Sequence, residues 1–187
     1  EQKEVGIGNA LRNQGQTEGQ SKSLIEVIKK WSTKKTLPLW GAMDMAHKLL
    51  AQQFKPEELI TQMNRIADLV AGTGGDITRI TRAYAQIRGK GKLQAQEANQ
   101  LAESFIDIRS AVLKLPKYQG KSIGDIMELG KAGLLPASDV DQAIKLLTSK
   151  GGMFYGAMAV RAETNLGRLE NLKDEATLLT IQIGKFF

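Results

Sequence analysis

The chain has 187 residues, a formal net charge of +6 and no cysteine. This length suffices for one domain of ordinary size, or for a domain followed by an extended helix. The absence of cysteine excludes disulfides and thiolate chemistry. No apolar run is long enough to cross a membrane, and the first four residues lack the features of a signal peptide. Because the chain does not begin with Met, we expect it to be an excised fragment or a processed product.

The composition favours helices. Hydrophobic residues make up 42% of the chain, but aromatic residues only 5%. Val and Thr are not concentrated in alternating runs, whereas Ala, Leu, Ile, Lys, Gln and Glu are abundant. We therefore predict an all-α fold in which helices pack through aliphatic side chains, and we expect no strands.

The N-terminal part is expected to be less ordered than the rest of the chain. Residues 1–22 are rich in Gly, Gln and Asn, so they are predicted to form a loose or partly helical lead-in. Order is expected to begin near Ser23, which has capping-box spacing with Glu26. Apolar residues then recur every three or four positions, which predicts a helical domain over residues 23–163 and about eight or nine helices in all.

The predicted helices begin at capping or proline residues and are joined by glycine turns. Their expected starts, in chain order, are near Ser23, Pro38, Pro56, Asp76, Gln94, Asp107, Ser122, Pro136 and Met153. Gly133 has the position of a left-handed helix stop. The segment from Met153 onward is predicted to be one long helix or a helix broken once, at Gly156 or Gly167.

The segment 164–187 has apolar residues in heptad spacing. Steps of three and four residues separate its members, which are Leu169, Leu172, Ala176, Leu179, Ile183 and Phe186. This spacing is typical of a helix that pairs in a coiled coil, and it predicts helix association through these residues. The pattern is short, so a terminal helix packed on its own domain also fits it. Because no stop signal follows, we expect a longer heptad helix to begin here.

The sequence contains no constellation typical of catalysis. Gly120-Lys121-Ser122 resembles the end of a phosphate-binding loop, but the glycine that this loop needs five residues earlier is replaced by Leu115. His47 is the only histidine, so it has no second histidine or cysteine with which to hold a transition metal. We therefore predict no catalytic, cofactor-binding or metal site, and no enzymatic activity.

A nucleic-acid interface is the alternative from another functional class. Its candidates form a basic helix face followed by a basic loop, and they are Arg79, Arg82, Arg88, Lys90 and Lys92. An ordinary solvated helix face explains the same residues. DNA is therefore considered as a partner only under this alternative.

Taken together, the segments resemble the domain near the N-terminal end of the tail tape measure proteins of long-tailed bacteriophages and prophages. The resemblance rests on the order and spacing of Ala71 to Asp76, Tyr84 to Ile87, Gly89 to Leu93, Glu97 to Leu101, Gly120 to Ser122, Met127 to Lys131, Thr148 to Gly152, Phe154 to Gly156 and Gly167 to Asp174. It is strongest from Leu37 to Gly184. The chain departs from the pattern at Ser104-Phe105-Ile106-Asp107, where relatives show Ala-Gly-Ile-Pro.

The resemblance implies a structural virion protein that sets tail length during tail assembly. Such a protein lies in the lumen of the tail tube, and in the host cytoplasm during assembly. The implied partners are a second copy bound through the C-terminal helix, tail tube proteins, and assembly proteins or chaperones. The turns that carry the family motif are Gly72, Gly74, Gly75, Asp76, Gly151, Gly152, Phe154, Tyr155 and Gly156.

Overall fold

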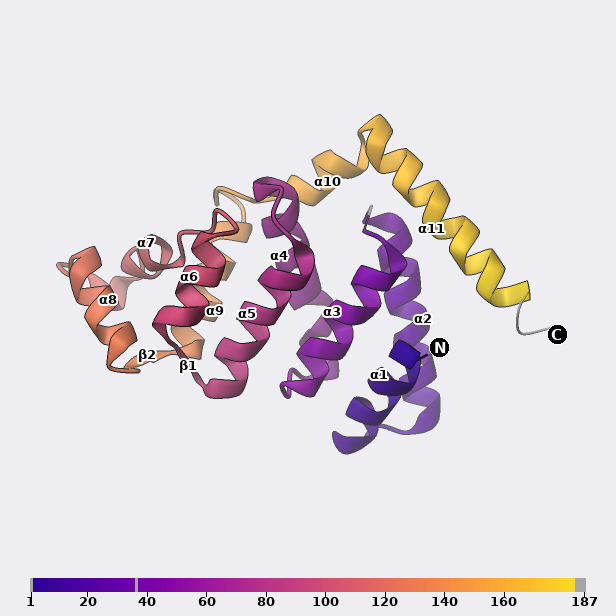
Figure 1. Cartoon of the computed structure of the whole chain (residues 1–187), viewed down its shortest axis with the longest axis horizontal. Helices are drawn as coiled ribbons and strands as arrows, with labels where there is room; N and C mark the ends of the chain where they lie inside the picture. Colours follow the sequence, from indigo (N-terminus) through magenta and orange to yellow (C-terminus); the bar gives the residue numbers. More distant parts are fainter. Residues whose placement is uncertain (1, 36, 184–187) are drawn as a thin grey trace. The chain divides into compact units, whose positions relative to one another are not determined.

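The computed structural model describes residues 2–35 and 37–183, without the side chains of Asn165, Leu166, Glu170 and Ile183. The fold of these residues is all-α, as predicted, and Figure 1 shows the helices in chain order. The contacts divide the chain into two compact units, Glu1–Ala67 with Ala157–Phe187, and Asp68–Gly156. These units do not follow the predicted boundaries at residues 22 and 163, because the C-terminal helices belong with the N-terminal ones.

The first unit consists of the N-terminal helices and the two C-terminal helices. Its elements are α1 (Gln2–Asn13), α2 (Glu18–Lys34), α3 (Leu39–Ala51), most of α4 (Pro56–Thr73), α10 (Ala157–Ala162) and α11 (Asn165–Ile183). The core lies between α1, α2 and α3, where Ile7, Ile28 and Leu49 are fully buried. No helix in the described ranges is long and apolar enough to cross a membrane.

The second unit contains the end of α4 and all the elements from α5 to α9. These elements are α5 (Ile77–Lys90), β1 (Lys92–Leu93), α6 (Ala95–Ala102), α7 (Ile108–Leu113), a 3-10 turn (Pro116–Tyr118), α8 (Ile123–Lys131), β2 (Leu135–Pro136) and α9 (Ala137–Thr148). The two short strands pair antiparallel, with Leu93 opposite Leu135. The expectation of no strands was therefore wrong for these four residues.

The described ranges hold eleven α-helices, two more than the upper predicted number. One addition is α1, which occupies the segment expected to be a loose lead-in. Ile7 and Leu11, one helical turn apart, are buried against the rest of the first unit. Order therefore begins well before Ser23, and the capping box that starts α2 is Thr17 with Gln20.

The other addition comes from a break in the C-terminal segment. The helical segment begins at Ala157, after Gly156 with its positive φ of +70°, and not near Met153 as predicted. It is broken at Glu163 and Thr164, and at neither of the predicted points, since Gly167 is part of α11. The Thr164 hydroxyl accepts a hydrogen bond from the Gly167 amide at 3.1 Å, so it caps the start of α11.

Local capping signals were predicted correctly in the second unit. The Asp76 carboxylate accepts a hydrogen bond from the Arg79 amide at 2.7 Å and starts α5. Ser122 and Asp125 form a capping box at the start of α8. Gly133 follows α8 with a φ of +67°, the left-handed stop that the sequence predicts.

Candidate helix-association site

The helix α11 presents two different faces. Its inner face packs in the first unit through Gly167 and Asp174, which are buried, and through Asn171, Leu178 and Ile181, which are half-buried. These residues are spaced four, three, four and three positions apart, so they also follow a heptad repeat. The less apolar of the two heptad faces is therefore the one that contacts the unit.

Asp174 attaches α11 to the start of α3. Its Oδ1 atom accepts a hydrogen bond from the Leu39 amide at 3.2 Å. Pro38 precedes α3 and provides no side-chain cap, so its first amides need a partner from elsewhere. A carboxylate at this position also interacts favourably with the positive end of the helix dipole. Asp174 thus caps α3 from a helix that is distant in the sequence.

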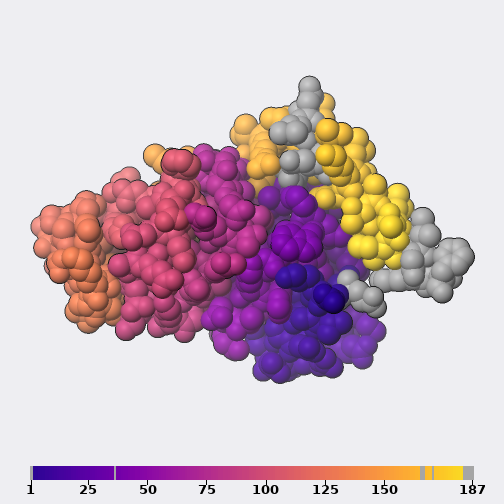
Figure 2. All heavy atoms as spheres, in the orientation of Figure 1, coloured from indigo at the N-terminus to yellow at the C-terminus, as the bar shows by residue number. Residues whose placement is uncertain are grey.

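The outer face of α11 carries the predicted association residues. The exposed fractions are 50% for Leu169, 61% for Leu172 and 59% for Leu179. Ala176 lies between them and is also exposed. The side chain of Ile183 is outside the described residues, as is Phe186. In Figure 2 the atoms of α11 lie at the molecular surface. The structure thus combines both interpretations of this segment, since α11 packs on its own unit and leaves an apolar stripe exposed.

A groove of about 380 Å³ runs between α2 and the C-terminal half of α11. It is lined by Glu26, Lys29, Lys30, Thr33, Lys34, Leu178, Ile181 and Gln182. Apolar atoms dominate its surface, because the lysines contribute the aliphatic parts of their side chains. Such a groove between two helices has the form that a third helix can fill.

The lysines that line this groove differ in whether they form ion pairs within the chain. Lys29 is buried and forms ion pairs with Glu4 at 2.7 Å and Glu26 at 2.9 Å. Burial alone would lower the pKa of Lys29, but the hydrogen bonds to the two carboxylates outweigh it and raise this pKa. Lys30 and Lys34 are exposed, and no carboxylate among the described residues forms an ion pair with them. Two positive charges are therefore available at the rim.

The family-motif turns come together at one end of the second unit, although about 80 residues separate them in the chain. A Cβ atom placed on Gly72 would lie 2.5 Å from Cδ1 of Phe154, so the first glycine turn packs directly on the second. A Cβ atom on Gly152 would lie 2.3 Å from the backbone oxygen of Leu146. Only glycine fits at these two positions. Phe154 is buried and Tyr155 is exposed.

Phe105, in the turn that departs from the family pattern, has a φ of +60°. This left-handed conformation is one that glycine adopts freely and that an L side chain rarely adopts. The turn therefore has a backbone geometry that suits glycine, although Phe occupies the position. The side chain of Phe105 is 78% exposed.

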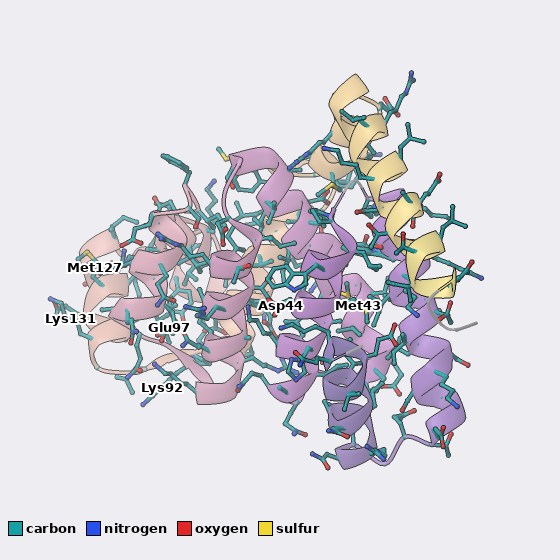
Figure 3. The ribbon with its side chains drawn as sticks, turned by 45° about the vertical axis from the view of Figure 1, so that its right-hand side comes forward. Met43, Asp44, Lys92, Glu97, Met127 and Lys131 are labelled. Atoms are coloured by element: carbon teal, nitrogen blue, oxygen red, sulfur yellow. The ribbon has the colours of Figure 1, made fainter. Side chains whose placement is uncertain are left out.

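The predicted basic face is largely neutralised within its own unit. Arg79 pairs with Glu103 at 2.6 Å, Arg88 with Asp141 at 2.7 Å, and Lys90 with Glu97 at 2.6 Å. Glu97 is completely buried on α6, one of the positions labelled in Figure 3. The other two candidates are Arg82, which is exposed, and Lys92, which is half-exposed. The structure does not bring all five together as free cations.

The remaining polar clusters hold helices together. Asp44 on α3 (Figure 3) is buried and accepts hydrogen bonds from Lys3 and Lys48. Burial would raise the pKa of Asp44, but the two lysines outweigh it and lower this pKa below the ordinary aspartate value. Among the described side chains, no three His, Asp or Glu residues are grouped so that they could hold a metal ion. His47 lies against Gly6 of α1.

A protein-family model described as "Tape measure protein" matches residues 6–185, which is nearly the whole chain. No curated protein and no solved structure matches the sequence. The matched range includes the second unit, the glycine turns, the whole of α11 and all but the two ends of the first unit. The match agrees with the resemblance that the order of the glycine turns indicates. The chain therefore belongs to the tape measure protein family.

Proposed function

We propose that the chain is the folded region of a phage tail tape measure protein, and that the full-length protein sets the length at which tail tube polymerisation ends. The observation that carries this proposal is the family match over residues 6–185. The all-α fold agrees with it, because a helix rises by about 1.5 Å per residue and provides a regular measure of length. We place the protein in the lumen of the tail tube, and in the host cytoplasm during assembly.

The apolar stripe of α11, which comprises Leu169, Leu172, Ala176 and Leu179, is the proposed association site. Exposed leucines in heptad spacing are favourable contacts for another helix. Ile183 continues the spacing in the sequence. The helix that binds there belongs to a second copy, to a tail tube protein, or to an assembly protein or chaperone. Association through this stripe is a structural role, and we expect it to need no cofactor.

Tail length in the parent phage tests the proposal. An in-frame deletion of about 70 helical residues outside the region described here is expected to shorten the tail by about 100 Å, given the helical rise. Electron microscopy measures this change directly. A deletion of the same size in a non-helical region of the protein is the control. Tails of unchanged length with the helical deletion would contradict the ruler function.

Nucleic-acid binding is the alternative function, and the ion pairs of Arg79, Arg88 and Lys90 reduce its support. If the basic face binds phosphates, retention of DNA by the purified chain should weaken steeply as salt concentration rises. Gel-shift measurements with single-stranded and duplex DNA at low salt would detect this binding. Retention that is lost in an Arg82→Ala and Lys92→Ala double variant would favour the alternative.

A further inference from the structure

We propose that the C-terminal half of α11 is a strap with an open and a closed position, and that it closes onto α2 and α3 of its own chain by tilting about the break at Glu163 and Thr164. The inference concerns packing within one copy, so it goes beyond the association proposed above. It rests on two gaps beneath this half of the helix and on the close packing that precedes them. All of these features belong to the first unit.

The N-terminal half of α11 is held closely to the unit. Its buried residues, Gly167 and Asp174, are seven positions apart and therefore lie on nearly the same face of the helix. Gly167 has no side chain, which lets the helix backbone approach its neighbours. Asp174 accepts the hydrogen bond from the Leu39 amide. The helix is thus attached as far as Asp174.

Beyond Asp174 the packing is incomplete on both sides of the helix. The groove of about 380 Å³ lies toward α2, and a second gap of about 190 Å³ lies toward α1 and α3. The second gap is lined by Lys3, Glu4, Lys29, Leu39, Trp40, Met43, Thr177 and Ile181. Lys29 and Ile181 line both gaps, so the two gaps flank the same part of α11. No described apolar side chain in this half is fully buried.

Closure removes apolar surface from water. Leu178 and Ile181 are half-buried at the gaps, and Trp40, which lines the second gap, is 61% exposed. The walls of both gaps are mainly apolar, so an inward movement of α11 brings apolar surfaces together. Because α11 is already attached to the unit, filling the gaps with its own side chains costs less entropy than binding a second molecule. The helix that fills them is therefore α11 itself.

The chain has a hinge that suits this movement. Figure 1 shows the turn between α10 and α11, where the helical pattern is interrupted at Glu163 and Thr164. A helix that tilts about such a break moves most at its far end. Leu172 and Leu179 lie on the outer face and remain exposed in both positions. Closure therefore changes the direction of the exposed stripe relative to α2 and α3 without covering it.

Distances between spin labels test the proposal, because the chain has no native cysteine and introduced cysteines alone are labelled. Val27→Cys on α2 and Thr180→Cys on α11 replace exposed residues that line neither gap. Pulsed electron paramagnetic resonance on the full 187-residue chain with this pair should give two distance populations, of which the shorter is the closed position. The matched pair, Val27→Cys with Arg168→Cys near the hinge, should give one.

Substitutions on the two faces of α11 identify the side chains that fill the gaps. Leu178→Ser with Ile181→Ser should lower the ratio of the shorter to the longer population at least about tenfold, because it removes the apolar side chains that closure buries. Leu172→Ser with Leu179→Ser makes a similar chemical change on the outer face and should leave this ratio unchanged. Circular dichroism checks that each labelled chain is folded.

A single distance for the pair that includes Thr180→Cys would overturn the proposal. So would an equal fall in the population ratio for the inner-face and outer-face variants. Two populations for both label pairs would mean that the whole of α11 leaves the unit, which contradicts a strap held at Asp174. A shorter population that grows with protein concentration would assign the filling of the gaps to a second copy and would also overturn the proposal.

Discussion

The helices α1 and α11 both pack on the first unit, but they are attached in different ways. α1 buries Ile7 and Leu11 completely, and its Gly6 lies in close contact with His47 of α3. The described side chains of α11 include no fully buried large apolar residue, and Leu169, Leu172 and Leu179 are exposed. The difference indicates that α1 is part of the core, whereas the most apolar face of α11 is exposed.

The largest expected effect comes from removing a core contact of α1. Leu11→Ala should lower the free energy of unfolding by about 3 kcal/mol, because it deletes a buried side chain and leaves a cavity. Urea denaturation followed by circular dichroism measures this loss. Leu172→Ala is the matched control, with the same chemical change on the exposed face of α11. Equal losses of unfolding free energy in the two variants would mean that α1 and α11 are packed equally well on the first unit.

The attachment of α1 through Asp44 should depend on pH. Because the folded-state pKa of Asp44 is lowered, its ion pairs with Lys3 and Lys48 stabilise the fold above the unfolded pKa of about 3.9. This stability is lost as the pH falls below that value through the folded pKa. Asp44→Asn should therefore lose about 2 kcal/mol at neutral pH. The variant and the wild type should converge as the pH falls toward 2.

Thermal unfolding curves at pH 7 and at low pH measure this convergence. Asp107→Asn is a suitable comparison, since the Asp107 carboxylate caps α7 and belongs to the second unit. An Asp44 variant whose deficit stays the same down to pH 2 would show that the lysine contacts do not depend on the charge of the carboxylate.

The sequence predicted local features well and distant contacts poorly. Asp76 and Ser122 were identified as caps because capping involves residues three positions apart. The α1 segment was not expected to be a regular helix, because its Gly and Asn content lowers intrinsic helix propensity. The burial of Ile7 and Leu11 by other helices overrides this propensity.

The exposure of α11 was predicted in part, and association through it stays a prediction. The heptad spacing identified Leu169, Leu172 and Leu179, which are exposed. The spacing could not identify Asp174 as a cap for Leu39, because 135 residues separate them. The groove beside α2 was also missed, since no local pattern in α2 indicates which helix lies next to it. A second, weaker heptad of Gly167, Asn171, Asp174, Leu178 and Ile181 was the only available signal.

A smaller loss of stability is expected when the Asp174 cap, which attaches α11 to α3, is removed. Asp174→Ala removes the hydrogen bond to the Leu39 amide and should cost about 1 kcal/mol, the usual value of an N-cap. Hydrogen exchange should become faster at the start of α3 and along α11, because the two helices then separate more readily. Exchange in α1 should change little. Faster exchange throughout the unit would indicate a general loss of packing instead of release of α11.

The smallest effect on stability is expected at the exposed stripe. Leu172→Gln with Leu179→Gln should change the unfolding free energy of the monomer by less than about 0.5 kcal/mol, as is usual for surface positions. If the stripe is an interface, the same double variant should nevertheless abolish association of the chain, because it replaces apolar contacts with amides that docking must desolvate. Denaturation at low protein concentration and sedimentation at high concentration separate these two effects. A variant that unfolds early even as a monomer would place the leucines in the core, and α11 would then resemble α1.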